Sequence, residues 1–168
     1  GALNNVAVGH NALSGLTTGD GNTCIGSEAG VDITTGESNV AVGYQALDNL
    51  DSGDKNTAVG TSALTTYDNS GSGNNTAVGF YAGGSLTGGK FNTIMGSYAG
   101  DLLTSGQYNT IVGYEADADV NSQTNTTIIG TGSVFKFLSK EYTCDHASDS
   151  GDDARSASSE SSPLKLPA

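Results

Sequence analysis

The residues most able to do acid–base or metal chemistry in this chain are few, and they form no familiar catalytic pattern. Only two histidines are present, His10 and His146. His146 lies near Cys144, Asp145 and Asp149, side chains that can bind a metal ion when the fold brings them together. No Ser-His-Asp arrangement, phosphate-binding loop or dinucleotide-binding fingerprint stands out. The sequence therefore predicts neither an enzyme nor a bound cofactor or metal.

The setting of these residues favours simpler roles. His10 occupies a position in an internal repeat where other copies have Ser, Tyr, Thr or Phe, which indicates a surface or packing role. Cys24 stands where other copies have Ala or Ile, so we expect a small buried hydrophobic side chain. A disulfide between Cys24 and Cys144 is the alternative. His146 belongs to a tail whose composition predicts disorder, which disfavours a metal site there.

Acidic residues of the repeats fall mainly at predicted turns: Asp20, Glu37, Asp48, Asp51, Asp54 and Asp101. Calcium is one conceivable ligand, but the nonapeptide pattern of calcium-binding β-rolls is absent. We interpret these carboxylates as solvated turn residues that keep the protein soluble.

Composition sets the broad class of protein. The 168 residues include 25 glycines and no tryptophan, and only 35% are hydrophobic, of which the small residue Ala is the most frequent. Such small side chains fill a thick globular core poorly, but they can fill a thin core that is built layer by layer. The net charge of −12 repels phosphates, so nucleic acid is excluded as a partner. No run of about 18 apolar residues occurs, so no membrane insertion is expected.

An internal repeat organises most of the chain. Its glycines follow one another every 17 residues, with one 19-residue step caused by an insertion within 69–74: Gly9, Gly26, Gly43, Gly60, Gly79, Gly96, Gly113 and Gly130. We number each repeat from the residue four places before this glycine, which is position zero. Position zero is Asn in seven copies, namely Asn5, Asn22, Asn39, Asn56, Asn75, Asn92 and Asn109, and Thr126 in the eighth.

Four other positions of the repeat are nearly constant. Position one is β-branched: Val6, Thr23, Val40, Thr57, Thr76, Thr93, Thr110 and Thr127. Position three is apolar: Val8, Ile25, Val42, Val59, Val78, Met95, Val112 and Ile129. Position seven is Ala from Ala12 to Ala116, and position eleven is apolar: Leu16, Ile33, Leu50, Tyr67, Leu86, Leu103 and Val120.

This pattern predicts an all-β fold, a parallel β-solenoid of about eight 17-residue coils. Positions one to five alternate with period two, as in a short strand. Stacked at about 4.8 Å, the coils would form a rod about 38 Å long. We expect positions three and eleven to stack in the interior. The asparagines should form a hydrogen-bonded ladder, and the invariant Ala should mark a close approach of two walls.

The chain divides into three predicted segments. Residues 1–134 form the solenoid, and residues 135–144 are a candidate capping strand, because the end of a solenoid must be covered. Residues 145–168 form an acidic, Ser-rich tail with almost no large apolar residue, which predicts disorder.

Two segments carry a resemblance to a known family. NVAVGYQAL at 39–47 and NTAVGTSAL at 56–64 resemble the head repeats of trimeric autotransporter adhesins and the similar repeats of phage tail fibres. The likeness covers about residues 1–134, although the 17-residue period is longer than the usual adhesin repeat. It implies a left-handed β-roll with three chains around one axis. It also implies an extracellular location, on a cell surface or in a virion fibre, and attachment to a host glycan or protein.

A homotrimer would also answer a physical problem, because thin coils bury little apolar surface by themselves. We expect small residues at positions two, four and seven to pack against neighbouring chains. A monomeric solenoid, with these residues lining its own interior, is the alternative. The function that follows is a structural fibre or adhesin segment, a rigid rod that also mediates attachment.

Two kinds of ligand-binding solenoid remain as alternatives. Ice binding requires a regular threonine face. The file that begins at Thr17 and Thr34 is interrupted by Asp51 and Asp68, and we expect the position-one threonines to share a face with the core valines. Glycan binding would use exposed aromatic residues, for which Tyr44, Tyr81, Tyr98 and Tyr114 are the candidate ligand contacts, with Tyr108, Phe80 and Phe91 nearby. The same rings could instead pack between chains.

Overall fold

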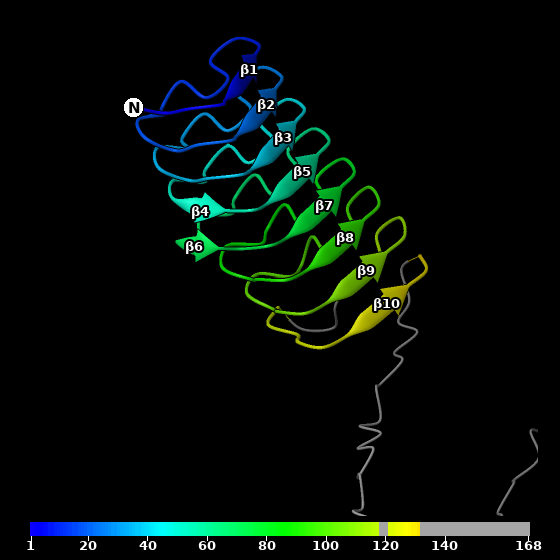
Figure 1. Ribbon diagram of the computed structural model, residues 1–168. Helices are drawn as coiled ribbons and strands as arrows, with labels where there is room; N and C mark the ends of the chain where they lie inside the picture. Colours follow the sequence, from blue (N-terminus) through cyan, green and yellow to red (C-terminus); the bar gives the residue numbers. More distant parts are fainter. Residues whose placement is uncertain (118–120, 132–168) are drawn as a thin grey trace, which may run out of the picture.

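The computed structural model describes residues 1–117 and 121–131, which form a solenoid of β-strands and turns without any helix (Figure 1). One strand of three residues occurs in each repeat. The eight strands are β1 (Val6–Val8), β2 (Thr23–Ile25), β3 (Val40–Val42), β5 (Thr57–Val59), β7 (Thr76–Val78), β8 (Thr93–Met95), β9 (Thr110–Val112) and β10 (Thr127–Ile129).

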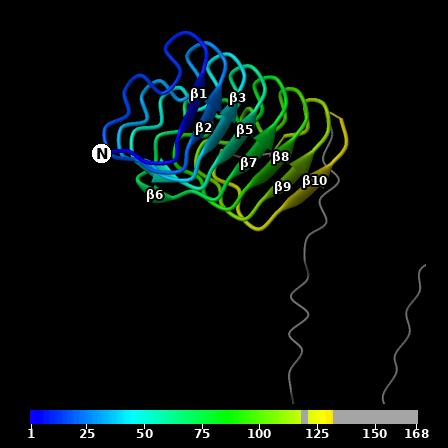
Figure 2. The same cartoon turned by 45° about the horizontal axis from the view of Figure 1, so that its top comes forward.

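These strands form one parallel sheet in the order β1-β2-β3-β5-β7-β8-β9-β10, so each coil adds its strand next to that of the preceding coil. The pairing never slips: position two of one coil lies opposite position two of the next, as in Ala7 with Cys24 and Ala58 with Ala77. Figure 2 shows the strands side by side along one wall of the stack. The predicted parallel solenoid with a 17-residue period is confirmed.

The two-residue insertion is absorbed without a change of register. Gly71–Ser72 (β6) pairs with Gly53–Asp54 (β4) of the preceding coil. The two strands form a separate sheet that lies apart from the row of eight strands (Figure 1). The only local consequence for the asparagine column is at Asn56. Its side-chain amide donates to the Asp54 carbonyl oxygen at 3.0 Å rather than to a carbonyl of its own coil.

The strand faces are the reverse of those expected from the sequence, which is a correction. Position two points inward and is fully buried in every coil from Cys24 to Ile111. Position three points outward, and Val8, Ile25, Met95 and Ile129 are 40–56% exposed. A period-two pattern has two phases, and a shift of one residue exchanges the faces. In coils two to five the smaller residue of each pair faces inward, whereas in coils six to eight an isoleucine faces inward, so residue size alone does not select the phase.

The interior is filled from the other walls of the coil. Position eleven lies inside as predicted, with Ile33, Leu50, Tyr67, Leu86 and Leu103 fully buried. The position-seven alanines are buried from Ala29 onward and line the same core. Positions two and seven therefore pack within one chain, and they are not available to a neighbouring chain as the sequence suggested.

Position eight is a part of the core that the repeat pattern did not indicate, and it compensates for size differences at position two. Leucine at position eight accompanies alanine at position two, as in Leu47 with Ala41. Glycine at position eight accompanies larger neighbours. A Cβ atom on Gly100 would lie 3.2 Å from Ile94 Cδ1, and one on Gly30 would lie 2.7 Å from Cys24 Sγ. In coil five Ala77 and Gly83 are both small, and the Leu64 and Ile94 side chains of the neighbouring coils fill the space beside Gly83.

The position-four glycine marks a close approach between coils. At Gly43 the backbone has φ +136°, which side chains rarely adopt, and a Cβ atom would lie 2.5 Å from the Gly60 carbonyl oxygen. The same approach recurs from Gly9 to Gly113, where a Cβ atom would lie 1.9–2.5 Å from the carbonyl oxygen of the corresponding glycine in the next coil. Glycine is thus required in each coil because the strand turns away from the sheet against the backbone of its neighbour.

The asparagine column forms the predicted ladder. Each side-chain Oδ1 accepts a hydrogen bond from the backbone N–H of the next Asn at 2.8–3.2 Å, ending at Thr126. Each amide Nδ2 donates to a carbonyl at position fourteen of its own coil at 2.6–2.9 Å, except at Asn56. The side chains from Asn22 to Asn109 are almost fully buried. The column therefore ties coil to coil and closes each coil on itself.

The predicted capping strand at 135–144 and the predicted disordered tail at 145–168 lie outside the described residues. The same holds for Val120, the last member of the position-eleven column.

We expect Asn39→Leu to lower the free energy of unfolding by about 1–3 kcal/mol, because it leaves the Asn56 backbone N–H and the Gly53 carbonyl oxygen without their partner. Asn121→Leu, at an exposed site, is the matched control. Chemical denaturation followed by circular dichroism measures both. Equal stability of the two variants would contradict a structural role for the ladder.

Candidate functional site

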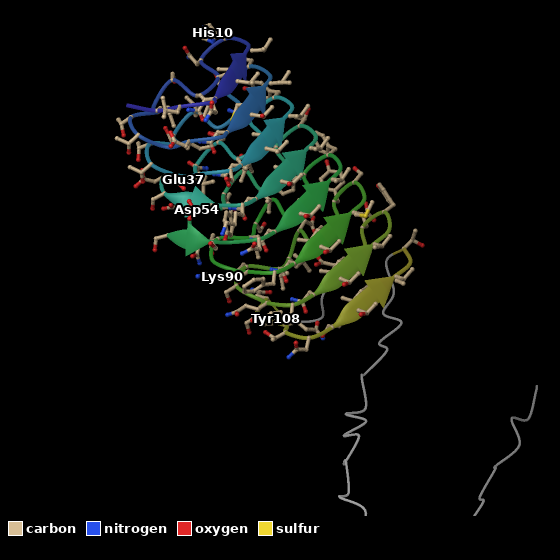
Figure 3. The ribbon with its side chains drawn as sticks, viewed as in Figure 1. His10, Glu37, Asp54, Lys90 and Tyr108 are labelled. Carbon is tan, nitrogen blue, oxygen red and sulfur yellow. The ribbon has the colours of Figure 1, made fainter. Side chains whose placement is uncertain are left out.

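The described part of the chain contains no group of three or more His, Cys, Asp or Glu side chains that could hold a metal ion. His10 lies exposed in the first coil (Figure 3), as a surface residue with no second histidine near it among residues 1–117 and 121–131. Cys144, Asp145, His146 and Asp149 lie outside the described residues.

The acidic turn residues bond to the backbone of neighbouring coils. Asp20 Oδ1 accepts the N–H of Leu3 at 2.6 Å, and Asp54 Oδ1 accepts the N–H of Glu37 at 2.9 Å. Figure 3 shows Glu37 and Asp54 on the same wall. Partial burial raises the pKa of Asp48, and the charges of Asp32 and Glu28 act in the same direction. These carboxylates stabilise turns and repel anionic ligands.

Two buried ionisable groups interrupt the apolar interior. Cys24 is a free thiol with no exposed surface, and burial raises its pKa from 9.0 to about 12. Tyr67 replaces the usual leucine of position eleven in the coil that carries the insertion. Burial raises its pKa from 10.0 to about 12, and the nearby Asn75 amide acts in the opposite direction. The Tyr67 hydroxyl is not within hydrogen-bonding geometry of any described group.

The outer face of the main sheet is the first candidate for a binding surface. It is made of positions one and three of all eight coils, and none of these 16 side chains is charged. All of them are exposed or partly exposed, and the aliphatic side chains of position three form an unbroken file along the stack. We call this surface the sheet face. The sequence placed its valines in the core and therefore missed it.

Two files of threonines run along the rod, and their hydroxyls differ. At position twelve, Thr17, Thr87 and Thr104 donate their hydroxyls to the backbone carbonyl of the next coil at 2.9–3.1 Å. At position one, the six threonines of the sheet face make no side-chain hydrogen bond to another described residue: Thr23, Thr57, Thr76, Thr93, Thr110 and Thr127. These six share a face with the position-three valines as expected, but that face is the outer one, so the expectation that they lie in the core was wrong.

Aromatic side chains form the second candidate surface, and they gather in coils five to seven. Phe80 and Tyr98 meet edge to face with centroids 5.1 Å apart, and Tyr81 lies 6.0 Å from Tyr98. Tyr114 follows in the next coil and is 54% exposed. Its pKa is raised because its hydroxyl bonds to Glu115, whose charge acts in the same direction. Of the four predicted contact tyrosines, Tyr81 and Tyr98 are thus in contact, and Tyr114 lies on the coil next to Tyr98.

The other aromatic residues lie apart from this group. Tyr44 is 48% exposed in coil three and pairs with no other ring in the described residues. Phe91 and Tyr108 stack face to face, 4.9 Å apart and 3° from parallel, where the chain enters β8 and β9. Figure 3 shows Tyr108 on the same side of the stack as Lys90, Glu37 and Asp54.

Comparisons of the chain with protein-family models, curated proteins and solved structures return no match. Among the described residues there is no helix of the length and apolarity needed to cross a membrane.

Alkaline pH should reveal the two buried groups. Both pKa values are raised by folding, so the stability they contribute is present below the unfolded-state values of 9.0 and 10.0 and is lost as pH rises toward about 12. Each group can contribute a slope of up to about 1.4 kcal/mol per pH unit. The free energy of unfolding of Tyr67→Phe, measured by urea titration, should therefore fall less steeply than that of the wild type as the pH rises above 10. If the stabilities of the variant and of the wild type change with pH in the same way, a raised pKa of the buried Tyr67 hydroxyl is contradicted.

Proposed function

We propose that this chain is a structural rod, a segment of a surface or virion fibre that also mediates attachment. The observation that carries the proposal is the unbroken ladder from Asn5 to Thr126, which ties all eight coils together through buried hydrogen bonds. Backbone bonds link the other walls as well, for example Gly30 N–H to the Ala46 oxygen at 2.9 Å. A stack held on several walls resists bending, because any bend must stretch bonds on one side.

The sheet face supports self-association of this rod as a homotrimer. A single chain leaves a file of eight aliphatic side chains at position three in contact with water. Uncharged apolar strips of this kind are typical of surfaces that pack against another protein. Three sheet faces around one axis would cover the strips of all three chains. Positions one and three, rather than two, four and seven, would then form the contacts.

The resemblance of the repeats to adhesin heads and tail fibres supports the same assembly and an extracellular location. The acidic turn residues lie on other walls, so like charges of three chains would stay apart.

Light scattering tests the trimer. We expect a molar mass near three times 16.8 kDa for the wild-type chain. Val59→Glu and Val78→Glu together should lower the mass to that of a monomer, because two carboxylates in each chain would be buried without partners. Thr35→Glu adds one such charge at an exposed site outside the sheet face and should leave the mass unchanged. A monomeric wild type would contradict the trimer.

Ice binding is a second candidate function, favoured by the six free threonine hydroxyls of the sheet face. Strand pairing spaces successive position-one residues by about 4.8 Å along the rod. Regular hydroxyls alternating with methyl groups can order water on a flat surface. The face cannot serve both roles at once, since a trimer that buries it hides the hydroxyls. The mass of the wild type therefore separates the two functions.

If the face binds ice, the wild-type chain should inhibit ice recrystallisation, and Thr93→Lys should abolish the effect by placing a charge in the lattice. Thr104→Lys is the matched control, because Thr104 belongs to the position-twelve file whose hydroxyls are already bonded. Growth of ice crystals in the presence of wild-type chain at the rate seen without protein would rule out this second function.

A further inference from the structure

The aromatic group of coils five to seven is built on a glycine. A Cβ atom on Gly84 would lie 2.5–2.6 Å from three ring carbons of Tyr81, so this ring rests directly on the backbone. Other coils have Ser14, Thr65 or Asp101 at the same position. Tyr81 is consequently half-buried, and it supports Tyr98 at a centroid distance of 6.0 Å.

The rings that rest on this support face solvent. Tyr98 is 36% exposed and meets Phe80, which is 46% exposed, at an interplanar angle of 68°. Tyr114 occupies the same position as Phe80 two coils further along the rod. We call Phe80, Tyr81, Tyr98 and Tyr114 the aromatic ledge. Two coil spacings make it about 10 Å long, which is enough for more than one sugar ring.

The backbone under the ledge is unfavourable for aromatic residues. Tyr81 and Tyr98 have φ of +54° and +56°, in the left-handed region. The other coils place polar residues at this position, such as Asn11 and Ser62. The turn imposes this left-handed conformation in every coil from Asn11 to Glu115, and aromatic residues adopt it less readily than asparagine does. Exposed tyrosines at a position where five other coils have polar residues are a local departure from the repeat, and such a departure suggests a role in function.

We propose that the aromatic ledge binds a neutral polysaccharide by stacking of pyranose rings on Tyr98, Phe80 and Tyr114. The CH faces of sugars pack on aromatic rings, and the tyrosine hydroxyls at the ledge can bond to sugar hydroxyls. The ledge is an open surface rather than a cavity, which suits a polymer better than a small molecule. This proposal gives a ligand class to the attachment role proposed above, but it does not depend on the number of chains.

Charge restricts the ligand to uncharged glycans. Glu115 adjoins Tyr114, Asp101 lies three residues after Tyr98, and the whole chain carries a net charge of −12. Sulfated or uronic-acid polysaccharides would be repelled by these carboxylates. The stacked pair Phe91–Tyr108 is not part of the ledge, because each ring already covers one face of the other.

Affinity electrophoresis tests the proposal, since the acidic chain migrates readily in native gels. The gels contain laminarin, konjac glucomannan or dextran as neutral polysaccharides, and alginate as an acidic one. We expect at least one neutral polysaccharide to retard the wild-type chain and alginate to leave its mobility unchanged. Tyr98→Ala should weaken the apparent affinity about twofold to tenfold, the range expected for loss of an aromatic contact.

Two further variants separate the ledge from the fold. Gly84→Ser introduces the residue that coil one has at this position, and it should displace Tyr81 toward solvent and weaken binding while circular dichroism stays unchanged. Tyr44→Ala removes a more exposed tyrosine outside the ledge and should bind like the wild type. The proposal is overturned if no neutral polysaccharide retards the chain, or if Tyr98→Ala binds as tightly as the wild type.

Light scattering on Tyr98→Ala completes the test. If this variant has a lower molar mass than the wild type, the ledge is a contact between chains and the glycan proposal fails. An unchanged mass together with weaker retardation supports the glycan site. A monomeric wild-type chain that still binds polysaccharide would contradict the trimer alone and leave the ledge proposal standing.

Discussion

The buried amide of asparagine constrains this molecule more than any other group. An amide inside a protein must satisfy both its oxygen and its nitrogen, since an unpaired polar atom there costs about 1–3 kcal/mol. In each coil the Asn oxygen accepts the backbone N–H of the next Asn, and the nitrogen closes the coil on the carbonyl of position fourteen. These bonds exist only when every coil has the same length between the two positions. Where the insertion lengthens coil four, Asn56 changes its partner to Asp54, and the bonds to Asn39 and Asn75 persist.

A fixed coil length leaves a fixed and narrow interior, and the remaining core positions share it. Position eleven contributes one large side chain per layer, while the side chains of positions two and eight share the remaining interior volume. Leu47 accompanies Ala41 in one layer, whereas Gly100 accompanies Ile94 in another. Such paired changes let the layers fit together, and where Ala77 and Gly83 are both small, the Leu64 and Ile94 side chains of the neighbouring coils lie beside Gly83. The strand phase that places position two in this interior turns positions one and three outward, and these form the uncharged sheet face.

Function in such a rod must therefore come from its outward positions. The core and the ladder repeat from coil to coil, and the surface is where the coils differ. The free threonine hydroxyls, the aliphatic file and the aromatic ledge all lie on residues that the ladder does not constrain. The ledge adds a feature that the repeat alone does not supply: Gly84 replaces a side chain so that Tyr81 can rest on the backbone and support Tyr98. A regular scaffold with local exceptions on its surface is the physical basis of both proposals.

The sequence by itself determined the period, the parallel stacking, the asparagine ladder and the burial of position eleven, because each of these follows from spacing and residue type alone. It could not determine which phase of the alternating strand faces inward, since Thr-Ala-Val is compatible with either face until the space inside is known. It also grouped Tyr44 with Tyr98 because both are tyrosines of the repeat, whereas in the structure they lie three coils apart. Only the tertiary structure decided that Val42 faces outward, that Gly100 makes room for Ile94, and that Tyr81 lies on Gly84. These depend on distances between residues of different walls and coils, which a linear pattern does not contain.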